Sequence, residues 1–205
     1  MNTDVLKQML TLRGVNIGSP EVIESDFPAT ITKYDSVLVV VSNRTRINEK
    51  DVSTIVDLTR EKGCSTGIIV VPIPPSETIV NAIAGVSDIL QIFHEKQLSY
   101  NPAEHRKVPR HRILTKEESD KMMEKYHINI QDITTRLQKD KIQFTENILQ
   151  FIGMKHPEYM PMPYILAGDA MARWIGAKPG DFVEILRRSE TAGSTPYYRF
   201  CVANV

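Results

Sequence analysis

The sequence predicts an α/β amino-terminal domain, with a mixed sheet and covering helices, and a small α+β carboxyl-terminal domain that ends in a β-hairpin. Between residues 36 and 93, continuous apolar runs alternate with amphipathic helical patterns, the order typical of a sheet covered by helices. The segment Ile175–Val202 instead holds two alternating strands around a polar Gly/Pro loop. A length of 205 residues allows two domains. We place them at 1–103 and 104–205.

The spacing of apolar residues and the residues that begin or end helices predict the elements of the amino-terminal half. Apolar residues at helical spacing, bounded by capping or stop residues such as Gly14, Gly63 and Ser76, predict helices over 4–12, 48–62 and 76–86. Runs of β-branched and apolar residues predict strands over 36–42, 66–71 and 88–93. The order strand, helix, strand, helix, strand favours parallel pairing under covering helices.

The carboxyl-terminal half opens after residues 99–109, which are rich in proline, histidine and basic side chains and are predicted to form a linker. Thr115 and Glu118 have the spacing of a capping box, which predicts a helix to Tyr126. Asp169 is positioned to begin a second helix that stops at Gly176. Apolar residues between 131 and 162 suggest one or two further helices. Alternation predicts the closing strands at 182–186 and 197–202.

The composition is that of an ordinary globular protein, with 41% hydrophobic and 24% charged residues. The 25 basic and 25 acidic residues cancel, which argues against a polycation built to coat nucleic acid. Cys64 and Cys201 have no companion at zinc-binding spacing and are expected to be buried apolar residues. The apolar runs are too short to span a bilayer and no signal peptide is evident, so we expect a soluble intracellular protein.

The sequence contains no phosphate-binding loop, no dinucleotide fingerprint and no metalloprotease or serine-hydrolase motif. The histidines are scattered and do not predict a metal site: His94, His105, His111, His127 and His156. Neither a cofactor nor a small-molecule substrate is therefore expected. One alternative stays open, a free-standing nucleic-acid-binding protein or metal-dependent nuclease that uses the α/β domain, with Asp35 as a metal ligand.

The residues that close the chain form a distinctive pattern. A Gly180-Asp181 turn precedes the first strand, Arg187 ends it, and Ser189–Gly193 and Tyr198-Arg199 follow. Upstream, three further segments join the pattern: Val108–His111, Ile113–Glu118 and Asp169–Arg173 with Gly176. Together these segments resemble the fifth subunit of multisubunit DNA-directed RNA polymerases, which the three nuclear enzymes of eukaryotes share, and its shorter archaeal counterpart, the H subunit.

The amino-terminal half is similar to the jaw domain of the eukaryotic subunit, mainly through Leu6–Gly14, Gly67–Val71 and the order of elements. The resemblance thus covers nearly the whole chain. Two departures stand out: a short amino-terminal domain, and an insertion at about 132–158 before Met162–Ile165. These departures resemble a copy encoded by a large cytoplasmic DNA virus, most like that of African swine fever virus. A viral copy implies host cytoplasm and virion as its location, and a cellular copy implies the nucleus.

The resemblance implies a subunit without catalysis of its own and without cofactor, membrane or small-molecule substrate. The carboxyl-terminal domain would be the assembly module, which binds the largest polymerase subunit and neighbouring small subunits. The implied interface residues are Arg110, His111, Arg173, Gly180, Arg187, Glu190, Gly193, Tyr198 and Arg199. The jaw would meet downstream duplex DNA without reading its sequence, through Pro75 and Ser76.

Overall fold

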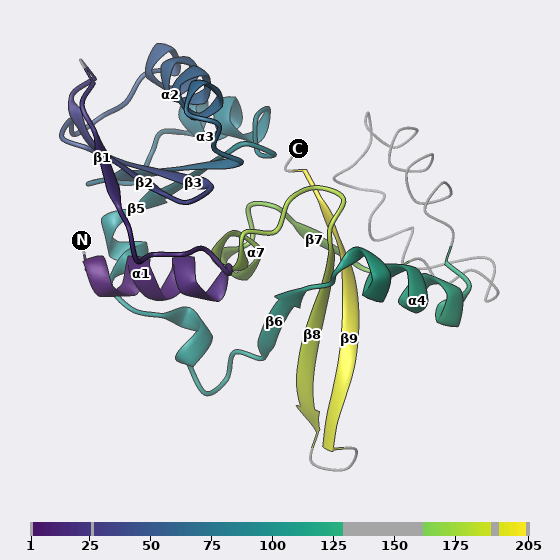
Figure 1. Cartoon of the computed structure of the whole chain (residues 1–205). Coiled ribbons are helices and arrows are strands. Elements are labelled where there is room, and N and C mark those ends of the chain that lie inside the picture. Colours follow the sequence, from purple (N-terminus) through teal and green to yellow (C-terminus); the bar gives the residue numbers. More distant parts are fainter. Residues whose placement is uncertain (1, 26, 129–161, 190–192, 204–205) are drawn as a thin grey trace.

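The fold contains two β-sheets that are joined by one continuous chain (Figure 1). It is seen in a computed structural model that describes residues 2–25, 27–128, 162–189 and 193–203. Both sheets are mixed and carry helices, so the predicted fold class is confirmed. The predicted insertion at 132–158 and the helices suggested between 131 and 162 lie mostly or wholly outside the described residues.

The first sheet has the order β1-β2-β3-β4-β5. Its strands are β1 (Glu21–Ile23), β2 (Ala29–Tyr34), β3 (Val37–Ser42), β4 (Thr66–Val71) and β5 (Leu90–His94). The first three strands pair antiparallel, and β3, β4 and β5 pair parallel. The sequence did not predict β1 and β2. Asp35 makes the tight β2–β3 turn with a φ of 48°, a left-handed conformation that aspartate tolerates better than most residues.

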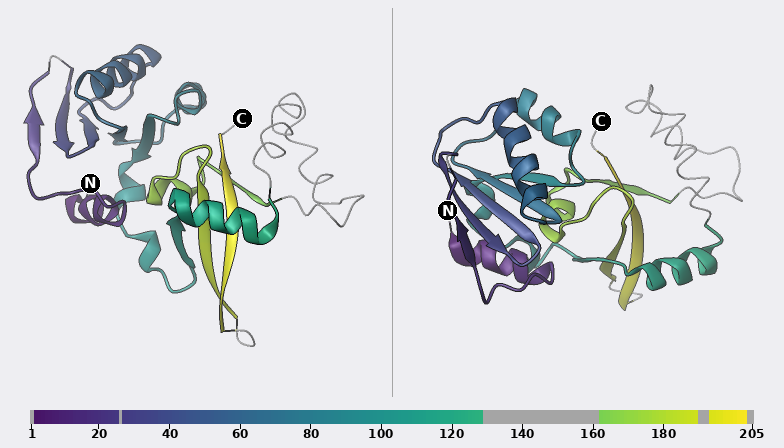
Figure 2. Two further views of the ribbon diagram at one scale, coloured as in Figure 1. Left: turned by 45° about the vertical axis from the view of Figure 1, so that its right-hand side comes forward. Right: turned by 45° about the horizontal axis from the view of Figure 1, so that its top comes forward.

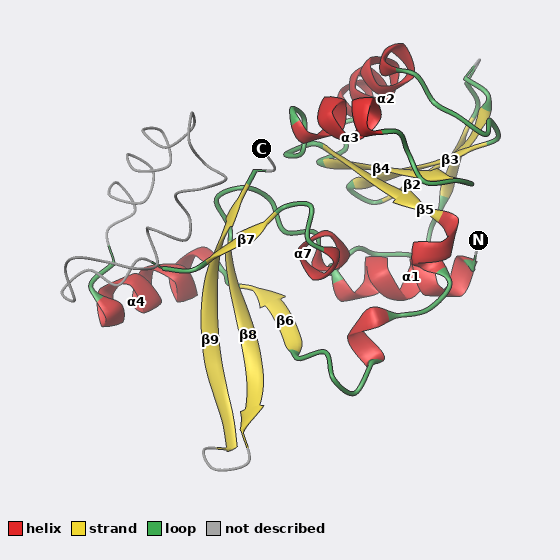
Figure 3. Ribbon diagram, turned by 180° about the vertical axis from the view of Figure 1, so that it is seen from behind, coloured by secondary structure: helices red, strands yellow, loops and turns green. Residues whose placement is uncertain are grey.

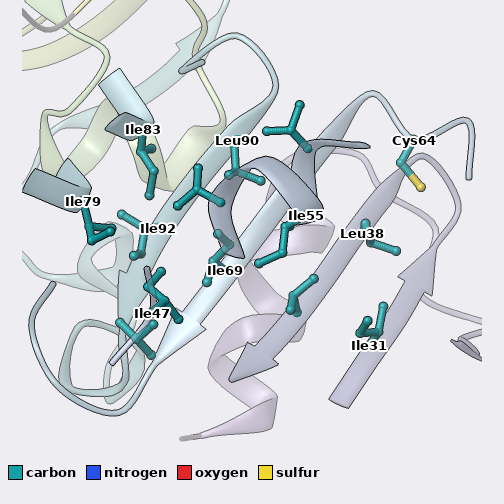
Figure 4. Packing of buried hydrophobic residues seen from close by; sticks show 14 residues of the cluster. Ile31, Leu38, Ile47, Ile55, Cys64, Ile69, Ile79, Ile83, Leu90 and Ile92 are labelled. Atoms are coloured by element: carbon teal, nitrogen blue, oxygen red, sulfur yellow. The ribbon is translucent and has the colours of Figure 1, made fainter. Parts of the chain in front are cut away.

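Helices cover both faces of this sheet (Figure 3). They are α1 (Thr3–Leu12), α2 (Glu49–Glu61) and α3 (Glu77–Ala84), close to the predicted ranges. On the face of α2 and α3, aliphatic side chains such as Leu38, Ile55 and Ile69 form one core (Figure 4). Short 3-10 helices at Glu95–Leu98 and Pro102–Glu104 follow β5, and the second lies in the predicted linker 99–109.

The second sheet has the order β6-β8-β9-β7. Its strands are β6 (Arg110–Ile113), β7 (Tyr164–Leu166), β8 (Phe182–Ser189) and β9 (Gly193–Val202), and its helices are α4 (Lys116–Tyr126) and α7 (Ala170–Ile175). The Thr115–Glu118 capping box and the Asp169 cap are present as predicted, and Gly176 ends α7 with a φ of 79°. One cluster packs under α7 and another under α4, on opposite faces of the sheet. Both hairpin strands are longer than the predicted ones.

The two halves share a core through α7. Met171 and Trp174 are buried against α1 and the first sheet, in the cluster that also holds Met9, Leu10 and Phe93. The remaining buried members of that cluster come from α1, β2, β3 and β4 and include Leu98. A helix of the carboxyl-terminal half therefore completes the hydrophobic core of the amino-terminal half. The division at 103/104 stays a prediction, and none of the described helices is long and apolar enough to cross a membrane.

Candidate functional site

The β8–β9 hairpin extends away from the rest of the second sheet (Figures 1 and 2). β6 pairs with β8 only over Val183–Leu186, and β7 pairs with β9 only over Phe200–Val202. Beyond these pairings, Arg187 pairs with Thr195 and Arg188 with Ser194, and no further strand among the described residues pairs with β8 after Leu186 or with the outer edge of β9 before Phe200. We call residues 187–189 and 193–199 the hairpin arm. Its edges can accept an added strand.

The arm carries an ordered cationic and aromatic group. The guanidinium of Arg187 lies 4.2 Å from the ring centroid of Tyr197, and that of Arg199 lies 5.7 Å from the same ring. Arg199 also donates a hydrogen bond of 3.1 Å to the Tyr164 carbonyl oxygen. A guanidinium over a tyrosine ring is stabilised by the ring quadrupole, and its planar fork remains suited to a carboxylate. The arm therefore presents preorganised positive charge.

An ion-pair network fixes the base of the arm. Arg112 on β6 donates to Glu184 on β8 at 2.9 and 3.3 Å, and to both carboxylate oxygens of Glu118 on α4 at 2.9 and 2.8 Å. These bonds raise the pKa of Arg112, and the hydrogen bond from Arg112 lowers the pKa of Glu118. Arg112 is not among the site residues predicted from the sequence. A basic residue six positions before the capping-box residue Glu118 was a signal in the sequence. The other partner of Arg112, Glu184 on β8, is 72 residues away.

The other predicted interface residues of β6 and the hairpin spread over the second sheet. His111 is partly buried, its Nδ1 lies 2.7 Å from the Pro109 carbonyl oxygen, and burial lowers its pKa. Arg110 is exposed opposite Leu186. Tyr198 packs toward α4, with its ring 5.8 Å from that of Tyr126. The two glycines Gly180 and Gly193 have φ values of 101° and 68°, at the base and the tip of the hairpin.

Two predicted residues do not join this group. Glu190 lies outside the described residues. Arg173 lies on α7, where its Nη1 donates a hydrogen bond of 2.9 Å to the Ile92 carbonyl oxygen. Its guanidinium lies 5.1 Å from the centroid of the Phe93 ring. Burial lowers the pKa of Arg173. Arg173 therefore contacts the first sheet, away from the arm.

The second predicted site lies at the edge where the parallel strands end. The loop that contains Pro75 and Ser76 follows β4, and Asn43–Asn48 follows the neighbouring parallel strand β3. Since carboxyl ends of parallel strands share one edge, the two loops are neighbours, and we call them the loop edge. Ser76 is exposed and precedes α3, without a capping hydrogen bond from its side chain in the described structure.

Two arginines that were not predicted as site residues also lie on the loop edge. Arg44 and Arg46 are both exposed, and Arg44 forms an ion pair of 3.5 Å with Asp51. The start of α3 adds backbone N–H groups that favour anions, although Glu77 opposes them. The edge thus combines two arginines with a helix start. Because β3 and β4 are parallel neighbours, the loops that follow them lie side by side. The predicted parallel pairing therefore already implied that Arg44 and Arg46 lie near Ser76.

Comparison with known proteins identifies the family. The model for "RNA polymerase Rpb5, C-terminal domain" matches residues 100–158 and 145–201. The RNA polymerase subunit Rpo5 of Aeropyrum pernix is 36% identical over 100 residues, which are 49% of this chain and 79% of the relative. That of Thermococcus kodakarensis is 34% identical over 103 residues, 50% of this chain and 90% of the relative. The chain belongs to the Rpb5 family.

The Rpb5 similarity also reaches the amino-terminal half. Subunit rpabc1 of RNA polymerases I, II and III from Dictyostelium discoideum is 28% identical over 172 residues, which are 82% of this chain and 73% of the relative. The archaeal relatives cover only about half of the chain. The Rpb5 model matches in two pieces that overlap between 145 and 158, inside the predicted insertion.

The nuclease alternative gains nothing from this geometry. Asp35 forms the turn between β2 and β3, and this structural role explains an aspartate at this position without a metal ion. Within the described part of the chain, no group of three or more His, Cys, Asp or Glu side chains could hold a metal ion. Cys64 and Cys201 are both buried, as predicted.

Proposed function

We propose that this chain is a non-catalytic subunit of a multisubunit DNA-directed RNA polymerase. Its carboxyl-terminal half would anchor it to the largest subunit, and its amino-terminal half would form part of the jaw beside downstream DNA. The observation that carries the proposal is the hairpin arm, an extended pair of strands with ordered arginines on a domain that matches the Rpb5 family. Nucleotide addition would take place in other subunits.

The arm suits docking by strand addition. A partner strand can hydrogen-bond to a backbone edge of the arm, and such main-chain bonds supply affinity without demanding a particular sequence. Arg187 and Arg199 would then set the register by charge-assisted bonds to acidic side chains of the partner. Because Arg112 braces the base of the arm, little ordering entropy would be lost on docking.

Co-purification tests this anchoring. In cells that express a tagged full-length chain, the largest polymerase subunit should be recovered with it at physiological salt. Arg187→Glu should reduce the recovery at least about fivefold, since one like charge at contact distance costs about 1 kcal/mol even in water. Arg60→Glu, an exposed position on α2, is the matched control and should have no effect. Absence of the largest subunit from the wild-type purification would contradict the proposal.

The loop edge suits a sequence-neutral contact with duplex DNA. Exposed arginines and backbone N–H groups bind phosphates, which every sequence presents alike. In an assembled polymerase, the double variant Arg44→Gln/Arg46→Gln should reduce the salt dependence of downstream DNA binding by about one unit of log–log slope per lost phosphate contact. An unchanged slope would exclude these arginines from the DNA contact, whatever the outcome for the arm.

We also propose that this copy is encoded by a large cytoplasmic DNA virus, as the short amino-terminal domain and the segment 132–158 suggest. In that case it acts in host cytoplasm and is packaged in the virion. Immunostaining of infected cells tests this: signal at cytoplasmic viral replication sites is expected, and exclusively nuclear signal would oppose a viral origin.

A further inference from the structure

We propose that the groove between α3 and the β7–α7 turn binds an acidic, apolar segment of a partner polypeptide. Two adjoining cavities of about 320 and 590 Å³ form this groove. They share Val80 and Ala84 of α3 on one side and Gly168 of the turn on the other. The groove therefore lies where the two halves of the chain meet. Arg199, whose guanidinium also lies over Tyr197, lines one of the two cavities, so the groove adjoins the arm.

The walls of the groove expose apolar surface on both sides. Val80 is 42% exposed and Leu166 is 46% exposed, which is high for aliphatic side chains of a helix and a strand. Val80 and Ala84 are one helical turn apart, so both lie on the same face of α3. Contiguous exposed apolar surface in a concavity typically marks a binding site.

The floor of the groove is cationic. Arg173 and His94 line one cavity, and Arg199 lines the other. Three buried nitrogens of these residues have no hydrogen-bond partner in the described structure: Arg173 Nε, His94 Nδ1 and Arg199 Nε. Burial, and after it the charges of Arg173 and Lys96, lower the pKa of His94, so the imidazole is uncharged near neutral pH and Arg173 supplies the positive charge of that cavity. The two guanidinium nitrogens are unpartnered buried donors, and these carry a free-energy penalty that a carboxylate would remove.

Few acidic side chains compete for these cations. Among the described lining residues, Asp169 is the carboxylate, and its Oδ1 accepts the backbone N–H groups of Met171 at 2.8 Å and Ala172 at 3.2 Å. The charge of Asp169 raises the pKa of Arg173, but by less than burial lowers it. The groove is thus complementary to a negative ligand. Its apolar walls distinguish that ligand from nucleic acid, whose phosphates bind exposed cations in open, polar surfaces.

A peptide that alternates leucine and aspartate has the required chemistry, because its two side-chain types can meet the walls and the cations. We would titrate the full-length chain into a fluorescein-labelled nonapeptide of this kind and follow its anisotropy. Two control peptides replace either every aspartate by lysine or every leucine by serine. The acidic leucine peptide should bind at least about tenfold more tightly than either control, given what one charge or one buried apolar side chain contributes.

Paired charge variants at the exposed walls locate the binding. Val80→Glu and Leu166→Glu should each weaken the acidic leucine peptide about fivefold, whereas Val80→Lys and Leu166→Lys should leave it unchanged or tighter. The fluorescence of Trp174 checks that each variant is folded. Equal binding of acidic and basic peptides, or equal effects of Glu and Lys variants, would overturn the proposal. Neither result would bear on the polymerase pull-down, since the purified chain alone is measured.

Discussion

Replacing Arg13 with methionine should loosen the junction between the two halves of the chain. Arg13 follows α1, yet its Nε donates a hydrogen bond of 3.1 Å to the Trp174 carbonyl oxygen. Its Nη2 donates a hydrogen bond to the Arg173 carbonyl oxygen and another, of 2.8 Å, to Gln91 Oε1. Burial lowers the pKa of Arg13 to about 10. One guanidinium therefore caps the carboxyl end of α7 and holds it against β5.

The size of the effect follows from these bonds. A hydrogen bond to a charged group contributes about 1.5–3 kcal/mol, and methionine keeps most of the buried volume while leaving the carbonyl oxygens of α7 unpaired. We expect a net loss of about 3 kcal/mol in the free energy of unfolding. For a chain of this size, that loss corresponds to a decrease of about 6–12 °C in Tm. Lysine at position 13 should lose less, since it keeps the charge but not the fork.

Urea unfolding followed by tryptophan fluorescence measures this loss directly. Trp174 is the only tryptophan of the chain and is 2% exposed within the shared core, so its emission reports the junction itself. Lys7→Met, an exposed change on the same amino-terminal helix, is the matched control and should shift stability by less than about 0.5 kcal/mol. A loss below about 1 kcal/mol for the Arg13 variant, or an equal loss for the control, would show that the Arg13 hydrogen bonds do not hold α7 in place.

Three further outcomes are expected. Gly193→Val should strain the tip of the hairpin, because Gly193 has a φ of 68°, and reduce incorporation into polymerase; incorporation equal to that of wild type in a pull-down would count against this. Burial raises the pKa of Cys201 to about 12, so at pH 8 its thiol should react with a thiol reagent only as fast as the chain unfolds, and immediate labelling of native protein would disprove this. Burial lowers the pKa of both His94 and His111, so the unfolded chain binds more protons and stability should fall as pH falls through about 6.5. The double variant His94→Gln/His111→Gln should flatten this dependence in urea titrations, and an equal slope would show that other groups cause it.

Much of the fold was predictable because the parallel strands are buried on both faces. All six residues of β4 are buried, so its run of apolar side chains carries the signal. β1 and β2 gave no such signal, since β1 is a short edge strand with two exposed residues and β2 mixes buried and half-buried positions. Neither shows a continuous apolar run. Their pairing is set by the neighbouring strand β3 and by the turn at Asp35, which are tertiary features.

The site was predictable only where residues lie close in sequence. Arg187, Gly193 and Arg199 belong to one hairpin, so a local pattern and the resemblance to a family were sufficient to single them out. Arg112 and Arg13 were missed because their partners lie 72 and up to 161 residues away. The spacing along the chain indicates the Arg112–Glu118 pair, six residues apart, but neither the Arg112–Glu184 pair nor the contacts of Arg13. They become visible once the strands and α7 are placed.

The packing of α7 into both cores explains why the positions of the arm and the loop edge should be coupled. Met171 and Trp174 are three residues apart and enter the core of the first sheet, whereas Ala172 and Ile175, also three apart, enter the core of the second. A helix of six residues is unstable alone, so both cores must hold it, and neither can shift without disturbing the other. A partner that fixes the arm would thereby also fix the orientation of the first sheet. Anchoring at one end is then sufficient to position the loop edge at the other.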